Sequence, residues 1–455
     1  NTQSATAFRG FGGPQGMVGI ERVMDHIAHH LGRDPLEVRR VNYYAEAAPA
    51  AGGAGGLSAP HVDLRSTPPE DISGKKKQTT PYGMEVEDFI LHAMTDRLAE
   101  TGEYQRRRQA VADWNAANPV LKRGLALTPV KFGISFTLTH LNQAGALVHV
   151  YQDGSIHMNH GGTEMGQGLF QKVAQVAAAR FGVDVGAVKI TATDTGKVPN
   201  TSATAASSGS DLNGMAVKAA CDTIRDRIAA HLAQLHQVEP ASVRFEGGRV
   251  SVGSDASYSF AEAALIAYAA RISLSATGYY ATPKVEWDRI KGQGRPFFYF
   301  AYGAALTEVV IDTLTGENRI LRADLLHDAG ASLNPALDIG QIEGGYVQGA
   351  GWLTMEELVW DTKGRLRTHA PSTYKIPAVS DRPAVFNVAL WDGANREDTI
   401  YRSKAVGEPP FMLGISALMA ISDAVAACGP GYPALDAPAT PERILAAIRR
   451  VRHEL

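Results

Sequence analysis

The chain has 455 residues, of which 45% are hydrophobic and 20% charged, and its formal net charge is -3. This composition is typical of a globular protein of two or three domains, and the near balance of charge gives no indication of binding to nucleic acid or anionic membranes. We find no apolar run long enough to cross a bilayer and no signal peptide. The two cysteines, Cys221 and Cys428, fit no zinc or iron–sulfur spacing, which predicts buried thiols in a cytoplasmic protein.

The first 45 residues predict two helices. A glycine loop at residues 7–13 opens the first helix, with Pro14 in its first turn, and Gly32 ends it. The run Asp34-Pro35-Leu36-Glu37 has the pattern of a capping box and predicts the start of the second helix. Because Asn1 is followed almost at once by such material, we expect the chain to be the C-terminal piece of a longer polypeptide.

Residues 46–80 change in character. The segment 47–56 contains only small residues and proline, and residues 75–77 are three lysines. This composition predicts a surface loop or linker whose lysines are solvated, in preference to a phosphate site. Helical spacing returns near residue 90 and continues past Trp114.

The rest of the chain mixes strands and helices without a regular βαβ period. Alternating apolar residues on either side of Asp153-Gly154 predict a β-hairpin. The further predicted elements are helices after 161–168, after 201–210 to about 235, and at 340–351, 414–428 and 441–451, and strands at 188–192, 298–312 and 319–326. We therefore predict an α+β fold with mixed sheets, in two large subdomains, 1–125 and 126–455, joined near residues 115–135.

Four glycine-rich loops precede helices, at 9–13, 161–168, 204–208 and 340–349. Helix N-termini of this kind bind anions, but none of these loops has a dinucleotide or P-loop fingerprint. Gln167 and Gln341 each lie at a glycine bend, where an amide can donate to and accept from a metal-oxo group or a pterin edge. Taken alone, each glutamine is better explained as a structural loop residue.

The most distinctive acid is Glu408, in Ser403-Lys404-Ala405-Val406-Gly407-Glu408-Pro409-Pro410. The two prolines stiffen the backbone, and Gly407 allows close approach or positive φ, so this mount can aim one carboxylate as a general base. A solvated turn is the alternative. Phe11, inside a glycine loop, and Phe136 could clamp a flat heteroaromatic ligand, although Phe136 taken alone is better explained as a residue of a core strand.

Seven segments, in chain order, carry a resemblance to a known family. They are Thr6-Ala7-Phe8-Arg9-Gly10-Phe11-Gly12-Gly13-Pro14-Gln15, Lys131-Phe132-Gly133-Ile134-Ser135-Phe136-Thr137, Gly162-Thr163-Glu164-Met165-Gly166-Gln167-Gly168, Thr204-Ala205-Ala206-Ser207, Asp338-Ile339-Gly340-Gln341, Pro371-Ser372-Thr373-Tyr374-Lys375-Ile376-Pro377 and Lys404-Ala405-Val406-Gly407-Glu408-Pro409-Pro410. Together they closely resemble the molybdenum-binding part of the xanthine dehydrogenases, in the molybdenum hydroxylase (xanthine oxidase) family. The resemblance spans nearly the whole chain, although the linker at 46–80 is longer than the family leads us to expect.

The resemblance implies a molybdenum–molybdopterin cofactor and hydroxylation of hypoxanthine and xanthine to urate with oxygen from water. By this resemblance Glu408 is the base that deprotonates a molybdenum-bound hydroxyl, after which hydride passes to the sulfido ligand. The implied cofactor neighbours are Arg9, Gly10, Gln167, Ala205, Ala206, Ser207 and Gln341, with Arg9 and Ala206 lining the molybdenum through their backbone. The implied substrate contacts are the rings of Phe11 and Phe136 and a hydrogen bond from Thr137.

The resemblance also implies partners. Iron–sulfur clusters and FAD are expected on other chains or domains, in an assembly that dimerises and includes the rest of the molybdenum subunit; no nucleic-acid or membrane partner is expected. In this reading, residues 1–125 end a first molybdopterin-binding subdomain and 126–455 form the second. An aldehyde oxidase of the same family and a non-catalytic fragment remain alternatives, and a carbon monoxide dehydrogenase fits the Phe11 segment less well. The family's further substrate-binding glutamate and arginine lie upstream of the Arg9 segment.

Overall fold

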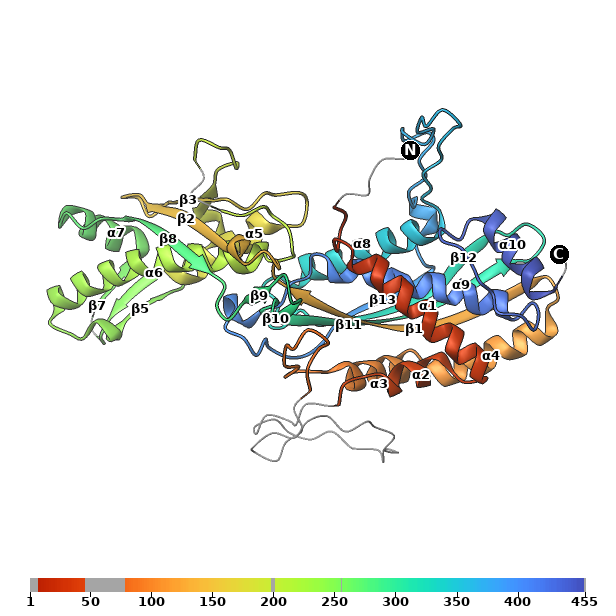
Figure 1. Cartoon of the computed structure of the whole chain (residues 1–455). Helices are drawn as coiled ribbons and strands as arrows, with labels where there is room; N and C mark the ends of the chain where they lie inside the picture. The colour runs from red at the N-terminus through yellow and green to blue at the C-terminus, as the bar shows by residue number, and fades with distance from the viewer. Residues whose placement is uncertain (1–6, 46–77, 198–200, 255, 454–455) are drawn as a thin grey trace.

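The computed structural model of the chain describes residues 7–45, 78–197, 201–254 and 256–453. Most of the predicted linker, including the three lysines, and Thr6 of the first segment therefore lie outside the described residues. Two lobes lie side by side along the long axis of the molecule (Figure 1). The smaller lobe is built from residues 143–281, and the larger lobe contains the strands and helices before and after that range.

The larger lobe is built on a four-stranded mixed sheet. Its strand order is β1-β11-β12-β13, antiparallel except for the parallel pair β12 and β13. The strands are β1 (Leu121–Ile134), β11 (Tyr299–Asp312), β12 (Asn318–His327) and β13 (Val385–Leu390). Almost every residue of β11 is buried, because helices cover both faces of the sheet.

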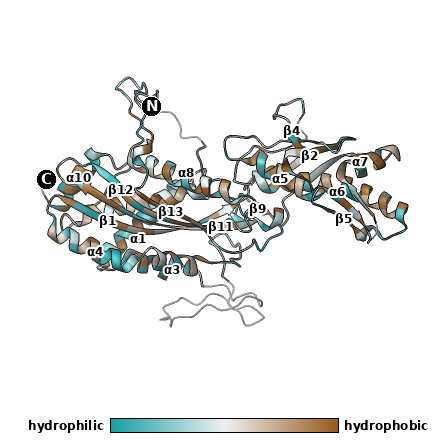
Figure 2. Ribbon diagram, turned by 180° about the vertical axis from the view of Figure 1, so that it is seen from behind, coloured by the Kyte–Doolittle hydropathy of each residue, from teal (hydrophilic) through white to brown (hydrophobic). Residues whose placement is uncertain are grey.

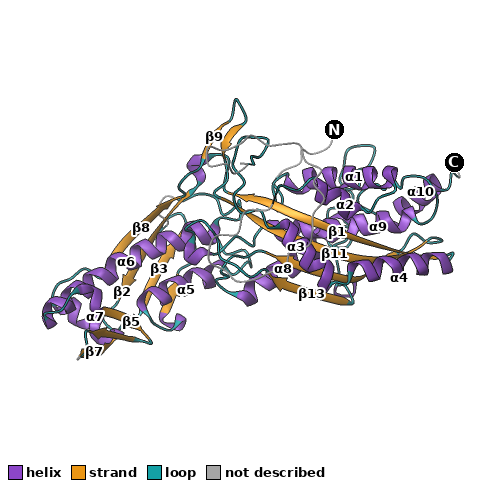
Figure 3. Cartoon of the chain, turned by 90° about the horizontal axis from the view of Figure 1, so that it is seen from below, coloured by secondary structure: helices purple, strands orange, loops and turns teal. Residues whose placement is uncertain are grey.

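The helices of the larger lobe form two layers, one on each face of this sheet (Figure 1), and Figure 3 shows the same helices and strands from below. They are α1 (Gly13–Leu31), α2 (Pro35–Val41), α3 (Leu91–Thr101), α4 (Tyr104–Ala117), α8 (Pro335–Thr354), α9 (Ile415–Ala426) and α10 (Pro441–Val451). Helices α8, α9 and α10 share one apolar core with the sheet, and α3 and α4 form another core on its opposite face. The helix sides that meet the strands are rich in hydrophobic residues, which are brown in Figure 2.

The smaller lobe repeats the same sheet pattern on a smaller scale. Its strand order is β4-β3-β2-β8, again antiparallel except for one parallel pair at the edge, β3 and β4. The strands are β2 (Gln143–Val150), β3 (Ile156–His160), β4 (Val188–Ile190) and β8 (Ser275–Ala281). The long helix α6 (Gly209–His236) approaches so closely that a Cβ on Gly278 of β8 would lie 1.9 Å from the carbonyl oxygen of Ala216.

Smaller elements complete the molecule. They are α5 (Leu169–Phe181), α7 (Phe260–Ala269), the three-stranded sheet β5 (Val243–Glu246), β6 (Arg249–Val252) and β7 (Ala256–Ser259), the hairpin β9 (Glu286–Asp288) and β10 (Gln293–Arg295), and the short 3-10 helices η1 (Thr139–Leu141), η2 (Val185–Ala187), η3 (Pro240–Ser242), η4 (Val379–Asp381), η5 (Ile400–Arg402) and η6 (Pro409–Gly414). The predicted α+β class with mixed sheets is confirmed. The predicted boundary at residue 125 falls inside β1, which pairs with β11 along its whole length, so the division into 1–125 and 126–455 stays a prediction.

One apolar segment contradicts the prediction that no apolar run is long enough to cross a bilayer. The stretch Pro409–Ala426, covering η6 and α9, is long and apolar enough for a membrane span. However, 89% of it is buried within the larger lobe, where α9 packs on β1 and β11. A Cβ on Gly124 of β1 would lie 2.0 Å from the carbonyl oxygen of Ala420, so strand and helix are in close contact. We therefore interpret this stretch as a core helix. Cys221 and Cys428 are both free thiols, as predicted, but only Cys221 is buried, and Cys428 is half-buried.

Candidate functional site

Glu408 lies where three loops from distant parts of the chain meet. Its Oε1 accepts a hydrogen bond of 3.2 Å from the backbone N–H of Gly10, in the loop before α1. Its Oε2 accepts a hydrogen bond of 2.9 Å from the hydroxyl of Ser207, in the loop before α6. The same hydroxyl accepts a hydrogen bond of 2.8 Å from the backbone N–H of Glu408. The half-buried carboxylate is thus fixed by both lobes, because Ser207 belongs to the smaller lobe and Glu408 to the larger.

The local sequence explains this mount. Pro409 and Pro410 open η6 immediately after Glu408, and both are buried. A Cβ on Gly407 would lie 3.2 Å from the Ser207 hydroxyl oxygen, so a glycine is favoured here for close approach and not for a positive φ. The rigid backbone that the sequence predicted at Glu408 is therefore present, and the direction of the Glu408 side chain is set by Ser207 and by the Gly10 amide.

A seam of glycines holds η6 against α8. Cβ atoms on Gly345 and Gly349 of α8 would lie 2.7 Å from the Cβ of Pro410 and 2.0 Å from the carbonyl oxygen of Phe411. A Cβ on Gly414, at the end of η6, would likewise be too close to the backbone of Gly349. The two backbones are therefore in direct contact just beyond Glu408, which fixes the distance from the carboxylate to α8.

The seam gives a matched pair of stability predictions. Gly349→Ala should force α8 and η6 apart and lower the free energy of unfolding by about 1–3 kcal/mol, the usual cost of overpacking. Gly344→Ala, on the same helix with nothing within 4 Å of its Cβ position, should instead raise it by about 0.5–1 kcal/mol, because alanine favours the helix. Urea unfolding of both variants checks this, and a Gly349→Ala variant as stable as Gly344→Ala would contradict the packing argument.

Arg9 lies beside the carboxylate and connects it to α8. Its Nε donates to the carbonyl oxygen of Gly407 (2.7 Å), Nη1 donates to Gln348 Oε1 (3.1 Å) and Nη2 is 3.3 Å from the backbone oxygen of Gln341 and 3.4 Å from its Oε1. Burial lowers the pKa of Arg9 to about 10, and the nearby charge of Glu408 opposes that shift. The side chain of Arg9 therefore orders the site, while the backbone contact to a metal implied for it stays a prediction.

Gln348 is a site neighbour that the sequence analysis missed. It lies seven residues after Gln341 on α8, a spacing that places both amides on one side of the helix. Helical spacing from Gln341 was the available signal.

The Gln167 loop is ordered by its own side chains. The carboxylate of Glu164 accepts hydrogen bonds from the backbone N–H groups of Gly166, Gly168 and Phe170. Burial tends to raise the pKa of Glu164, but these donors outweigh it and leave the pKa below its usual value. The amide of Gln167 accepts from the Met165 N–H (2.5 Å) and donates to the Thr163 carbonyl (2.7 Å). Its amide thus has a structural loop role, and its predicted place beside the cofactor stays a prediction.

The Ala205–Ser207 turn lies against this loop. The hydroxyl of Thr204 accepts a hydrogen bond of 2.8 Å from the Thr163 N–H. Ala206 and Ser207 have positive φ values of 54° and 57°, in the left-handed region that non-glycine residues rarely adopt. Two consecutive left-handed residues point the backbone in an unusual direction at the N-terminus of α6, and such outliers often mark functional sites.

The two predicted substrate rings differ in their surroundings. Phe11 has a left-handed φ of 44° and is 78% exposed, although it directly follows Gly10, which donates to Glu408. Phe136 is half-buried, and its backbone exchanges two hydrogen bonds with the side chain of Asn142. Thr137 beside it is exposed. Among the described residues no ring contact joins Phe11 to Phe136, so the aromatic slot stays a prediction.

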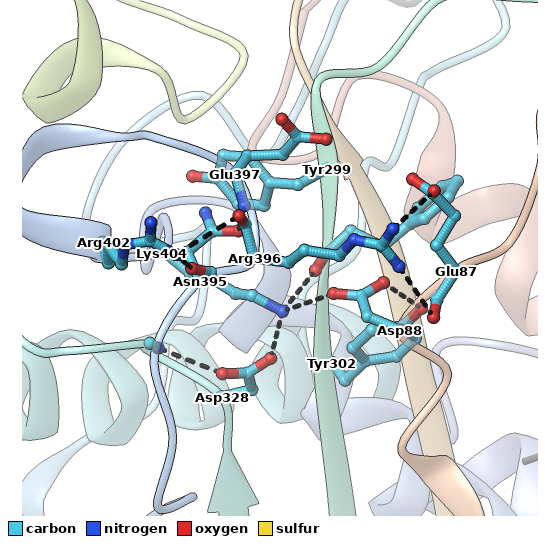
Figure 4. A network of polar contacts seen from close by, with 12 residues as sticks. Glu87, Asp88, Tyr299, Tyr302, Asp328, Asn395, Arg396, Glu397, Arg402 and Lys404 are labelled. Carbon is cyan, nitrogen blue, oxygen red and sulfur yellow. Dashed lines mark hydrogen bonds and ion pairs between the residues drawn. The ribbon is translucent and has the colours of Figure 1, made fainter. Parts of the chain in front are cut away.

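A buried polar network supports the loop that leads to Glu408 (Figure 4). The Lys404 ammonium contacts Asp328 (2.7 Å), Asp88 (3.1 Å) and the carbonyl oxygen of Phe300 (3.1 Å). The hydroxyl of Tyr299 accepts a hydrogen bond of 2.9 Å from the Ala405 N–H. Lys404 and Ala405 belong to one of the seven segments that carry the resemblance, but no role was predicted for either residue.

The donors at the site fit a molybdopterin. Within the described residues no group of three or more His, Cys, Asp or Glu side chains could hold a metal ion. A metal here would therefore need an organic ligand of its own, as a pterin dithiolene provides. The surrounding groups are the amides of Gln341 and Gln348, the Arg9 guanidinium and the backbone of two strained loops, which suit a polar heterocycle. The residues that would hold it are Arg9, Gly10, Ala206, Ser207 and Gln341.

Comparisons with known proteins agree with this chemistry. Residues 97–383 match one family of molybdopterin cofactor-binding domains and residues 1–43 match another of the same description. The chain is 44% identical to a xanthine dehydrogenase of Oryza sativa subsp. japonica and 43% identical to a xanthine dehydrogenase/oxidase of Mus musculus, in each case over 98% of this chain. It spans about 30% of the length of these curated relatives.

A solved structure extends the comparison of the fold. A reconstituted CO dehydrogenase from Oligotropha carboxidovorans superposes with a TM-score of 0.78 at 19% identity, covering 100% of this chain and 53% of the other. At this identity the likeness shows the fold alone.

Proposed function

The chain belongs to the family of molybdopterin cofactor-binding domains, and from this premise we propose that it is the catalytic, molybdenum-binding part of a xanthine dehydrogenase. The proposed reaction is hydroxylation of hypoxanthine and xanthine to urate with oxygen derived from water. The high identity to xanthine dehydrogenases over nearly the whole chain supports this substrate class.

The observation that carries the proposal is the fixed position of Glu408 between Gly10 and Ser207. When bound, the cofactor would supply the oxidising centre that takes up two electrons from the substrate carbon. The carboxylate of Glu408 would accept the proton lost by the attacking oxygen, in a position that needs no rearrangement during reaction. Its two hydrogen bonds leave further lone pairs free for that proton.

The other residues have supporting roles in the proposal. Arg9, Gly10, Gln167, Ala205, Ala206, Ser207 and Gln341 would contact the cofactor. Phe11 and Phe136 would enclose the purine ring and Thr137 would hydrogen-bond to it. An exposed Phe11 ring is free to pack on such a ligand, which would remove its apolar surface from water.

Iron–sulfur and FAD centres on other chains or domains would remove the electrons. We expect a dimeric assembly in the cytoplasm that includes the remaining part of the molybdenum subunit. The share of the relatives' length that this chain spans leaves room for such centres elsewhere.

The test is a comparison of substrates with the complete enzyme. We expect kcat/KM for hypoxanthine to exceed that for an aromatic aldehyde by at least about a hundredfold, because a pocket that pairs the polar edge of a purine rejects a ligand without it. A preference for the aldehyde would instead identify an aldehyde oxidase. Molybdenum analysis of the purified enzyme is the control, since a metal-free preparation that turns over neither substrate is the outcome expected of a non-catalytic fragment.

A further inference from the structure

We infer that Tyr299 is a positioning residue for Glu408, because its hydroxyl ties the start of helix α6 to the loop that carries the carboxylate. The inference rests on the proposed function of Glu408 as the base. Tyr299 does not contact the carboxylate itself and acts through the backbone of Ala405.

The hydrogen bonds of the Tyr299 hydroxyl have only one consistent direction. The Ala405 N–H can only donate, and it lies 2.9 Å from the phenol oxygen, so that oxygen accepts. The phenol proton is then directed to Oδ2 of Asp211, at 2.7 Å. Tyr299 starts β11 in the larger lobe and Asp211 lies in the first turn of α6 in the smaller lobe, so the hydroxyl bridges the two lobes.

This bridge has a counterpart four residues earlier in the chain. Ser207 lies in the loop just before α6 and Asp211 lies in the first turn of α6, and both connect to the same loop. Ser207 bonds Glu408 at the backbone and at the carboxylate, while Asp211 reaches Ala405 through Tyr299. Two connections, at Ala405 and at Glu408, prevent the short segment between them from turning about either one.

Burial makes the bridge difficult to replace with water. Tyr299, Asp211 and Ala405 are all buried, with 4%, 7% and 7% of their surfaces exposed. Burial also raises the pKa of Asp211 to about 7, opposed by the hydrogen bond from Tyr299. Figure 4 shows Tyr299 beside Lys404, whose ion pair with Asp328 holds the residue just before Ala405. Loss of the hydroxyl would therefore free the loop only on the side of Glu408.

Tyr299→Phe in the complete enzyme removes the hydroxyl and keeps the ring. We expect kcat for hypoxanthine to fall at least about tenfold, with KM within about twofold and molybdenum content unchanged, because a small displacement of a base slows the reaction without weakening substrate binding. Tyr346→Phe is the matched control, since Tyr346 is also fully buried and bonds Thr307 away from the loop. A kcat for Tyr299→Phe equal to that of Tyr346→Phe would overturn the inference.

A second pair of variants separates positioning from packing. Asp211→Asn keeps an acceptor oxygen for the phenol and should keep kcat within about threefold of wild type, whereas Asp211→Ala should lose as much as Tyr299→Phe. Equal losses in Asn and Ala would contradict the inference. The wild-type enzyme is measured alongside with both a purine and an aldehyde, and its preference tests the proposed function. The ratios of kcat between variants test the inference about Tyr299 with whichever substrate the enzyme hydroxylates, so the two failures can be told apart.

Discussion

Glu408→Gln is expected to lower turnover of hypoxanthine by a factor of about 10² to 10⁴ in the complete enzyme while the molybdenum content stays at the wild-type level. The factor is the usual contribution of a positioned general base, and an amide cannot take up the proton. Glutamine has the shape of glutamate and can still accept from the Gly10 N–H, so the three loops should stay together. Steady-state kinetics and metal analysis on the same preparation check both parts.

The control for this variant is Glu317→Gln, which removes one exposed carboxylate in the turn between β11 and β12. That turn follows the end of β11 opposite to Tyr299, roughly 45 Å away for a 14-residue strand. Its kcat should equal that of wild type. Near-normal turnover by Glu408→Gln, with metal retained, would exclude Glu408 as the base.

The elements with a clear period or strong end signals were predictable. The hairpin β2–β3, the helix α6 after its small-residue loop, the pair β11–β12 and the helices α9 and α10 all occur where the sequence placed them. Helix α8 begins at Pro335, before its predicted start at residue 340, so the stretch 340–349 with Gln341 is helical and is not the glycine-rich loop that we predicted. Asp34 caps α2 by accepting from the Leu36 N–H. These elements depend on local pattern, which a single sequence displays.

One of the longest strands could not be predicted from a local sequence pattern. Strand β1 was not predicted, because its central residues are buried on both faces and show no alternation. It also contains Pro129, which is compatible with a strand only at a sheet edge, and β1 is an edge strand.

The break between α3 and α4 was not predicted either. The helix predicted from residue 90 past Trp114 is divided into these two helices at Gly102 and Glu103, where Glu103 has a φ of 55°. A Cβ on Gly102 would lie 2.6 Å from Leu306, so tertiary packing fixes this break.

The candidate site was likewise predictable only in part. Resemblance selected Arg9, Gly10, Ser207, Gln341 and Glu408, and the structure brings these together, which a periodic pattern could not have predicted. Their roles toward cofactor and substrate stay predictions. Tyr299, Asp211 and Lys404 were missed, because each is a single polar residue whose partners lie far away along the chain.

Lys404→Met is expected to have the largest effect on stability, a loss of about 3–5 kcal/mol in the free energy of unfolding. The ammonium has three protons and three acceptors, on Asp328, Asp88 and Phe300. Lys404 and Asp328 are both almost fully buried, with 5% and 4% of their side chains exposed. Methionine fills the same space but leaves the Asp328 carboxylate buried without its cation, and that uncompensated charge is the source of the loss.

The pH dependence of Lys404→Met follows from the same contacts. Burial tends to lower the pKa of Lys404, but the two aspartates outweigh it and raise the pKa above its ordinary value. A raised lysine pKa contributes stability that is complete below the unfolded value of about 10.4 and disappears as pH rises through the folded value. The difference in the free energy of unfolding between wild type and Lys404→Met should therefore stay constant from neutral pH to about pH 10 and shrink above it.

Urea unfolding across this range measures the difference. The control is the exposed Lys363→Met, which is expected within about 0.5 kcal/mol of wild type. The double variant with Asp328→Asn should recover part of the loss, because it removes the unpaired charge; a Lys404→Met chain as stable as Lys363→Met would show that this network does not hold the loop of Glu408 in place.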